Sequence, residues 1–278
     1  MRRLGSGLVA VALLFVAIGL GLSDPQPVPA ARRVPERADA ETVERAPAVA
    51  PTRISLYGDS LAHQARPAFV AELTRRGPED RAVSTRPGAA LCDDRDVIMA
   101  DLLLRRPQVI VLEYSGNSFT GCMRDAAGTL LEIGSAGWLD RYVDDLRAVL
   151  TVAGVTDTSV VWATAPPVRH APDPENYPRR IAKAVRKLAT KQPLLRVVDT
   201  GAALATAEGS FAPDLPCRSD ERVFCLKGRI PSRAADGLHF DCHGTVDVLG
   251  GCEGYSAGGR RFGEAMADAA LATRRDAA

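Results

Sequence analysis

Short apolar runs alternate with helix-like segments from residue 53 to the end of the chain. In the segment 136–153, for example, apolar residues recur at three- and four-residue steps and form one apolar face. Such alternation is typical of a parallel sheet with crossover helices. We therefore predict a three-layer α/β/α sandwich around a flavodoxin-like, parallel five-stranded sheet of order 2-1-3-4-5. The predicted strands are 53–57, 81–84, 109–113, 159–163 and 195–198, and the predicted helices are 61–76, 95–105, 136–153, 179–190 and 255–272.

A serine stands at the first strand-to-helix junction of this pattern. Ser60 follows the run Leu56-Tyr57-Gly58-Asp59 and directly precedes the first predicted helix. A hydroxyl at this position is exposed at the edge of the sheet, close to the positive end of a helix dipole. Because serine is also a common helix N-cap, its position alone fits either a nucleophile or a cap.

An aspartate and a histidine lie three residues apart near the other end of the chain. One short turn can face the side chains of Asp236 and His239 the same way. With Ser60 they supply a nucleophile, a general base and a carboxylate that orients the base. His243 is a rival base, but no aspartate precedes it at the corresponding spacing.

These residues resemble the SGNH (GDSL-like) hydrolase family, whose members carry serine, glycine, asparagine and histidine in this chain order. The third block departs from the usual Gly-x-Asn-Asp, because serines flank its Gly-Asn pair. The resemblance runs from Arg53 to the C-terminus and implies an SGNH-type serine esterase that needs no cofactor. The matching residues are Ser60 in Gly58-Asp59-Ser60, Gly88 in Arg86-Pro87-Gly88-Ala89, Asn117 in Ser115-Gly116-Asn117-Ser118, and His239 with Asp236.

The predicted topology brings three of these residues to one edge of the sheet. Ser60, Gly88 and Asn117 follow strands 1, 2 and 3, which are neighbours in the order 2-1-3-4-5. The backbone N–H groups of Ser60 and Gly88 and the Asn117 amide would then form an oxyanion hole. Glycine and asparagine are also ordinary turn residues, so a purely structural role for Gly88 and Asn117 stays open.

Six cysteines and the other histidines allow two further interpretations. His239, Cys242, His243 and Cys252 could suggest zinc, but the chain has no Cys-x-x-Cys pair and we predict no metal. An even number of cysteines in an exported protein favours disulfides, although the sequence does not decide the pairing. The simplest hypothesis is sequential, Cys92 with Cys122, Cys217 with Cys225, and Cys242 with Cys252. The first of these would tie the two proposed oxyanion loops together.

His63, one turn into the first helix, is expected to face solvent, and His170 is a weak candidate for substrate contact.

The N-terminal segment resembles an export signal. Arg2 and Arg3 precede an uncharged, largely apolar run that ends at Leu22. We predict that residues 1–22 are either a cleaved signal or an N-terminal membrane anchor, and cleavage stays open. Residues 23–52 contain six prolines and no aromatic residue, which predicts a disordered linker. The SGNH-like domain then spans 53–278.

The formal net charge is +1, and no basic stripe with interleaved aromatic residues is present, which argues against a nucleic-acid partner. Export would place the chain outside the cytoplasm, secreted or anchored. We therefore predict an esterase that hydrolyses small acyl esters, O-acetyl esters in particular, on cell-envelope carbohydrates. Two alternatives stay open, an O-acyltransferase that moves the acyl group to a sugar hydroxyl through the same serine, and a catalytically inactive carbohydrate-binding module.

Overall fold

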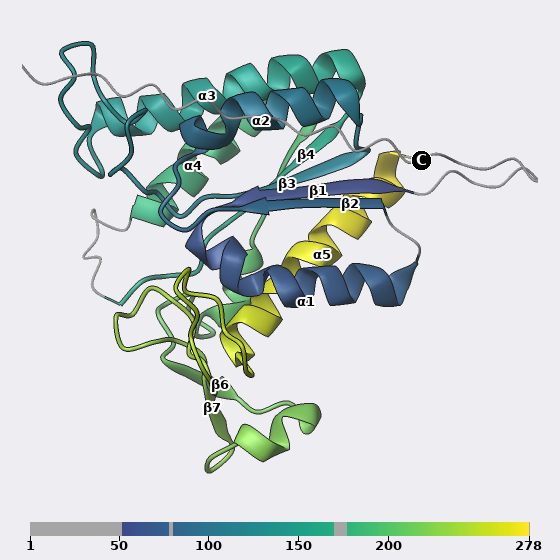
Figure 1. The fold of residues 1–278 in the computed structure, drawn as a ribbon, viewed down its shortest axis with the longest axis vertical. Coiled ribbons are helices and arrows are strands. Elements are labelled where there is room, and N and C mark those ends of the chain that lie inside the picture. The colour runs from purple at the N-terminus through teal and green to yellow at the C-terminus, as the bar shows by residue number, and fades with distance from the viewer. Residues whose placement is uncertain (1–51, 78–79, 170–176, 278) are drawn as a thin grey trace, which may run out of the picture. The chain divides into compact units, whose positions relative to one another are not determined.

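A computed structural model describes residues 52–77, 80–169 and 177–277. Its centre is a five-stranded sheet in the order β2-β1-β3-β4-β5, in which all neighbouring strands are parallel (Figure 1). The predicted strand order is therefore confirmed. The strands are β1 (Arg53–Gly58), β2 (Asp80–Thr85), β3 (Val109–Glu113), β4 (Ser159–Ala163) and β5 (Leu195–Val198).

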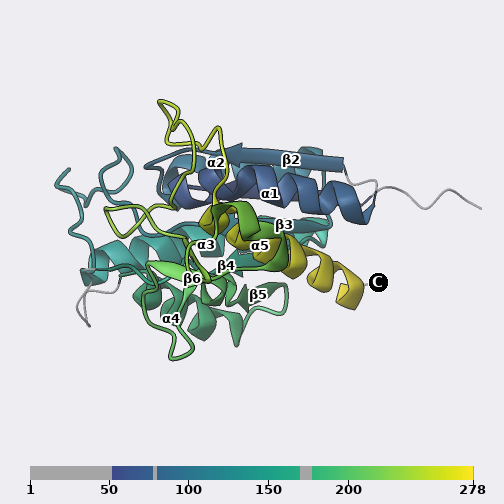
Figure 2. The same cartoon turned by 90° about the horizontal axis from the view of Figure 1, so that it is seen from below.

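Helices cover both faces of this sheet. One face carries α2, α3 and α4, and the other carries α1 and α5 (Figures 1 and 2). Because both faces are covered, the central strand β3 is buried along its whole length, and its sequence Val-Ile-Val-Leu-Glu is almost entirely apolar. The helices are α1 (Ser60–Arg76), α2 (Leu91–Leu104), α3 (Ala136–Thr156), α4 (Tyr177–Ala189) and α5 (Ala257–Ala277).

Two helix boundaries differ from the prediction by several residues. The helix α5 ends at Ala277 and not at residue 272, and α2 begins at Leu91 and not at residue 95. The Asp93 carboxylate accepts a hydrogen bond from the Ala90 backbone N–H at 2.8 Å, and this contact starts the helix earlier. An acidic residue in the first turn also suits the helix dipole. Cys92 therefore lies in the first turn of α2, and the helix backbone fixes the direction in which its side chain leaves.

Four short elements between β5 and α5 were not predicted. They are the 3₁₀ helices η1 (Thr200–Leu204) and η2 (Ser219–Phe224) and the antiparallel strands β6 (Asp214–Pro216) and β7 (Arg229–Pro231). Each strand has three residues and ends in proline, so neither shows a period-two pattern. This region leads directly into the segment that carries Asp236 and His239.

The predicted export segment, residues 1–22, and nearly all of the predicted linker lie outside the described residues. Among the helices that are described, none combines the length and the apolar character that crossing a membrane requires.

Candidate active site

Ser60 is the first residue of α1, at the carboxyl end of β1. The helix is capped by its neighbour Asp59, whose Oδ1 accepts from the Leu61 N–H at 3.0 Å. The Ser60 hydroxyl is therefore not needed as a cap. Gly58 lets the ends of β1 and β3 and the first turn of α1 come close together, because a Cβ at this position would lie 2.4 Å from the Glu113 carbonyl oxygen and 2.5 Å from the Ala62 Cβ.

The side chains of Ser60, His239 and Asp236 form one hydrogen-bonded chain. His239 Nε2 lies 3.0 Å from Ser60 Oγ, and His239 Nδ1 lies 2.6 Å from Asp236 Oδ2. The two contacts fix one tautomer, in which Nδ1–H donates to the aspartate and Nε2 accepts from the serine. The structure thus brings together the three residues that the sequence proposes as nucleophile, base and orienting acid.

A tight turn holds Asp236 against His239. The second oxygen of Asp236, Oδ1, accepts from the backbone N–H groups of Leu238 and His239 at 2.9 and 3.0 Å. Partial burial raises the pKa of Asp236, but the hydrogen bonds from the His239 ring and from these two N–H groups outweigh it and lower the pKa below its usual value. Gly237 adopts φ +72°, and a Cβ there would lie 2.4 Å from the Arg169 Cβ. The turn therefore presents an ionised carboxylate in one orientation.

The three predicted oxyanion donors differ in their hydrogen bonding. Gly88, with φ +79°, occupies a turn closed by the Ala89 N–H to the Arg86 carbonyl. Within the described parts of the chain, the N–H groups of Ser60 and Gly88 have no hydrogen-bond acceptor. The Asn117 amide, in contrast, donates to Asp59 Oδ2 at 3.0 Å and to the Ala89 carbonyl at 3.1 Å. Asn117 thus lies beside the Gly88 turn, and its role as a donor to substrate stays a prediction.

Two buried acids beneath the serine were missed by the sequence reasoning. Asp59 is fully buried, and its Oδ2 accepts from the backbone N–H and the hydroxyl of Ser115 at 2.7 and 2.6 Å, as well as from Asn117. Glu113, also fully buried, accepts from the Ala62 N–H at 3.0 Å. A signal was present, because Glu113 is a charged residue at the end of an otherwise apolar strand.

The two acids cannot both be ionised in this setting. Burial raises the pKa of Glu113 well above its usual value, and the charge of Asp59 raises it further. Burial also raises the pKa of Asp59, although hydrogen bonds from Ser115 and Leu61 oppose the rise. Because Asp59 accepts more hydrogen bonds than Glu113, we assign the charge to Asp59 and a proton to Glu113.

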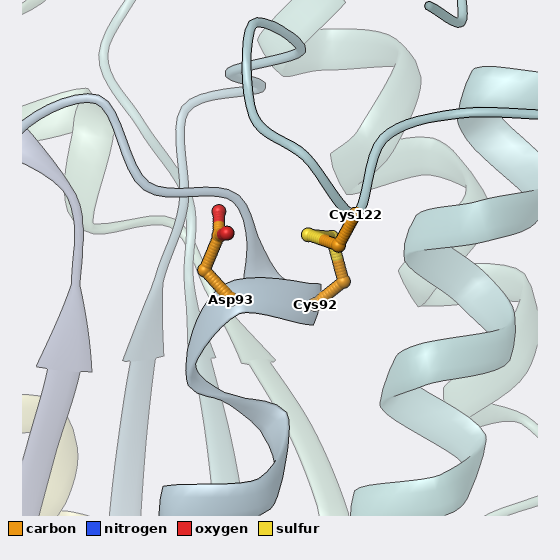
Figure 3. A group of neighbouring side chains, drawn as sticks. All are labelled: Cys92, Asp93 and Cys122. Carbon is orange, nitrogen blue, oxygen red and sulfur yellow. A yellow bond between two sulfur atoms is a disulfide. The ribbon is translucent and has the colours of Figure 1, made fainter. Parts of the chain in front are cut away.

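The six cysteines form three disulfides, Cys92–Cys122, Cys217–Cys225 and Cys242–Cys252, which are the sequential pairs. The first joins the start of α2 to the loop after Asn117 (Figure 3). Asp93 lies close to the two sulfurs. Because those sulfurs are bonded to each other, they offer no thiolate to a metal ion.

The remaining histidines have structural positions or are not described. The expectation that His63 faces solvent is wrong, since its side chain is buried and its Nδ1 lies 3.2 Å from Thr85 Oγ1. The apolar side of α1 packs toward the sheet at this turn, and burial lowers the pKa of His63. His243 stacks on Phe224 and Tyr255, with ring centroids 4.9 and 6.5 Å away, and does not contact Ser60. His170 lies outside the described residues.

A cleft of about 880 Å³ begins at the Asp236 turn. It runs along the loop after β3 and the start of α4, and its walls combine apolar, aromatic and charged side chains. Among the residues that line it are Phe119, Leu131, Tyr177, Arg180, Asp236 and Leu238. The cleft therefore offers room for a group much larger than an acetyl ester, and it meets the Ser-His-Asp chain at Asp236, whereas Ser60 and His239 do not line it.

Comparison with known proteins identifies the family and the fold. The profile of the DUF459 family, described as a protein of unknown function, matches residues 53–249. The chain belongs to the DUF459 family. No curated protein sequence matches it.

Solved structures share the fold of this DUF459 protein at low sequence identity. A variant of Axe2, an acetyl-xylooligosaccharide esterase from Geobacillus stearothermophilus, matches with a TM-score of 0.50 and 12% identity, over 80% of this chain and 94% of that chain. A protein described as lipolytic and of the G-D-S-L family, from Desulfitobacterium hafniense, has a TM-score of 0.49 and 14% identity, over 78% and 99% of the chains. The catalytic domain of peptidoglycan O-acetyltransferase A from Streptococcus pneumoniae has a TM-score of 0.49 and 15% identity, over 81% and 96%. The fold that the resemblance to SGNH hydrolases predicts is thus confirmed.

Proposed function

We propose that this protein is an exported serine esterase that hydrolyses small acyl esters, O-acetyl esters above all, on cell-envelope carbohydrates. One observation carries the proposal, the continuous contact from Ser60 Oγ through His239 to Asp236, at 3.0 and 2.6 Å. Those distances are within hydrogen-bond reach for a nucleophile, its base and the group that orients the base.

In the proposed reaction, Ser60 Oγ attacks the ester carbonyl carbon while His239 Nε2 takes the hydroxyl proton. Asp236 stabilises the imidazolium that forms, and the N–H groups of Ser60 and Gly88 stabilise the negative oxygen. The protonated His239 then gives its proton to the leaving alkoxide, and an acyl-Ser60 intermediate remains. Water then attacks this intermediate while His239 takes its proton. The acyl–Oγ bond breaks, His239 returns the proton to Ser60 Oγ, and the carboxylic acid leaves.

The Asn117 amide would be the third oxyanion donor. Its two N–H groups are engaged by Asp59 and by the Ala89 carbonyl, so either contact must lengthen or be shared when the oxyanion forms. Such catalytic hydrogen bonds often tighten only when substrate is bound.

The proposed substrate class draws on the cleft and on the disulfides. A cleft with aromatic and charged walls beside the Ser-His-Asp chain suits a sugar or an oligosaccharide that carries the ester. Three disulfides favour an oxidising compartment outside the cytoplasm. We propose accordingly that residues 1–22 direct export or anchor the chain, that 23–52 form a linker, and that 53–278 form the enzyme.

The test is hydrolysis of p-nitrophenyl acetate by the disulfide-intact protein and its Ser60→Ala variant. We expect kcat to fall by about 10³-fold or more, as for a lost nucleophile. Ser256→Ala is a matched control, because Ser256 Oγ only accepts from the Gly259 N–H at the start of α5. It should cost about 1 kcal/mol of stability and leave kcat unchanged. Turnover that survives in Ser60→Ala, or its absence in the folded wild type, would contradict the proposal.

A further inference from the structure

Arg233 is a buried cation directly beneath the Asp236 turn. It lies between β7 and Asp236 in the chain, and its side chain is only 4% exposed. No aspartate or glutamate of the described chain forms a salt bridge with it. Arg261 is a useful contrast, since it is 7% exposed and pairs with the fully buried Glu221.

The surroundings of Arg233 are largely aromatic. Its guanidinium carbon lies 5.6 Å from the centre of the Phe211 ring and 5.5 Å from that of Phe240. Two of its nitrogens, Nε and Nη1, are buried without a hydrogen-bond partner in the described chain. Burial lowers the pKa of Arg233 to about 10, so the group remains protonated at neutral pH.

This placement does not serve stability. Removing a cation from water costs several kcal/mol, and the cation–π attraction to two aromatic rings offsets only part of this desolvation free energy. An apolar side chain of similar length would fill the same space between Phe211 and Phe240 without the penalty. The position of the guanidinium therefore needs another explanation.

The polar contacts of Arg233 provide one. Its Nη2 donates to the Pro167 carbonyl at 3.0 Å and to the Gly237 carbonyl at 3.4 Å. Gly237 is the second residue of the Asp236–His239 turn, and its carbonyl also accepts from the Arg169 N–H at 3.2 Å. Arg233 thus joins this turn to the loop after β4.

The charge of Arg233 acts on the same turn. Asp236 is the carboxylate with which the guanidinium interacts most favourably, and this attraction opposes the effect of burial on the pKa of Arg233. The interaction is mutual, so the guanidinium also favours the ionised form of Asp236.

We propose that Arg233 is a positioning residue, which holds the Asp236–His239 turn from beneath and keeps the Asp236 carboxylate directed at His239. It does not contact the substrate. The inference rests on the proposed esterase function, because it assigns Arg233 a part in the same site.

The test compares Arg233→Met, Arg233→Lys and wild type with p-nitrophenyl acetate and by thermal unfolding. For Arg233→Met we expect kcat to fall about tenfold or more, with KM within about twofold, because a small ester makes few contacts with the cleft. Its Tm should stay within about 3 °C of wild type or rise, since an unpaired buried charge is removed. Arg233→Lys keeps the charge but cannot span both carbonyls as the planar guanidinium does, so its kcat should lie between the two.

Arg261→Met is the matched control. It leaves Glu221 buried without its partner, so we expect a lower Tm and an unchanged kcat per folded molecule. The proposal would be overturned if folded Arg233→Met had the wild-type kcat. It would also be overturned if Arg233→Met lost stability as Arg261→Met does and its activity fell only in proportion to the folded fraction. If Arg233→Met does not fold, an unchanged kcat in Arg233→Lys would overturn it.

A second readout separates this inference from the proposed function. The low-field proton NMR signal of the His239 Nδ1–H, identified by its loss in Asp236→Asn, should be shifted or broadened in Arg233→Met and retained in Arg261→Met. If the wild type has no Ser60-dependent turnover, the esterase proposal fails, and the NMR signal alone decides whether Arg233 positions the turn. An unchanged signal would then overturn the positioning role.

Discussion

The two sides of the proposed site are held in place by different means. Ser60, Gly88 and Asn117 follow β1, β2 and β3 directly, so the paired sheet backbone sets their positions. Asp236 and His239 lie between β7 and α5, in a segment from residue 232 to 256 with no helix or strand beyond isolated bridges. We refer to these as the nucleophile side and the base side.

A few side-chain contacts replace regular structure on the base side. Gln64 of α1 accepts from the Phe240 N–H and donates to the Gly250 carbonyl, both at 3.0 Å. The Cys242–Cys252 disulfide closes the loop that follows His239. The nucleophile side instead has Asp59, whose single buried carboxylate joins the start of α1 to the loop after β3.

The difference has a clear consequence for mutations. On the nucleophile side, the contacts that place the catalytic groups are also part of the buried core. A change there should reduce activity and stability together. On the base side, a single contact can be lost while the sheet and its cores remain, so activity should fall further than global stability.

The largest effect is expected for Asp59→Asn on the nucleophile side. The new amide group would face the donors of Ser115 and Asn117, which leaves buried donors without an acceptor. We expect a loss of about 3 kcal/mol in the free energy of unfolding and a fall in kcat of about 10², comparable to a lost oxyanion donor. Urea unfolding and p-nitrophenyl acetate kinetics measure the two quantities.

Asp101→Asn is the control for this change. Asp101 is also a buried aspartate that accepts from a serine hydroxyl, Ser55 Oγ at 2.5 Å, but it lies in α2 away from Ser60. It should lower stability and leave kcat unchanged. Equal kcat losses in both variants would show that the effect of Asp59 is a general consequence of a weakened core.

A smaller effect is expected when the Cys242–Cys252 disulfide of the base side is replaced by two serines. The loop after His239 then gains freedom, and we expect kcat to fall about tenfold because the imidazole is held less firmly. The free energy of unfolding should fall by about 2–3 kcal/mol at most, the range for a short closed loop.

Replacement of Cys217 and Cys225 by serines is the matched comparison. That disulfide closes a loop of similar length, with a sequence separation of 8 against 10, but it lies at η2. We expect a similar loss of stability and an unchanged kcat. A tenfold loss of kcat in both double variants would mean that the base side has no special dependence on its own disulfide.

The same contrast explains how much the sequence could predict. The strands β3, β4 and β5 have the predicted bounds, because each is a short apolar run between polar segments. The strand order then placed Ser60, Gly88 and Asn117 at one edge. On the nucleophile side, local pattern and topology together determine where the residues lie.

For the base side, the sequence predicted the two functional residues and their spacing but not the contacts that hold them in place. The Asp236-x-x-His239 spacing indicated a shared turn, but not the support of that turn by Arg233 and Gln64. Both contacts join residues that are distant in sequence or lie in irregular backbone, such as Gln64 with Gly250. No periodicity encodes such contacts, so a buried arginine without a carboxylate partner could only be found in three dimensions.

The smallest effect concerns the protonation of Glu113, and it tests why the nucleophile side tolerates two buried acids. The pKa of Glu113 is raised in the folded protein, whereas the unfolded chain has the ordinary value of about 4.3. Above that value the folded state binds more protons than the unfolded state, so this group makes the protein less stable as the pH rises. Glu113→Gln keeps an acceptor for the Ala62 N–H but cannot ionise. Near pH 5 we expect the variant to be within about 1 kcal/mol of wild type, and its relative stability should then increase by up to about 1.4 kcal/mol per pH unit.

Urea unfolding between pH 3 and pH 9 measures this difference. Glu221→Gln should show the opposite sign. Burial raises the pKa of Glu221, but the hydrogen bonds from Arg261, the Arg218 N–H and Tyr255, together with the charge of Arg261, outweigh burial and lower this pKa. In that variant, stability relative to wild type should fall as the pH rises through the acidic range and then remain constant. Parallel curves for Glu113→Gln and wild type would mean that Glu113 is ionised in the folded protein. Both buried acids beneath Ser60 would then carry a charge, and the assignment of the proton to Glu113 would be wrong.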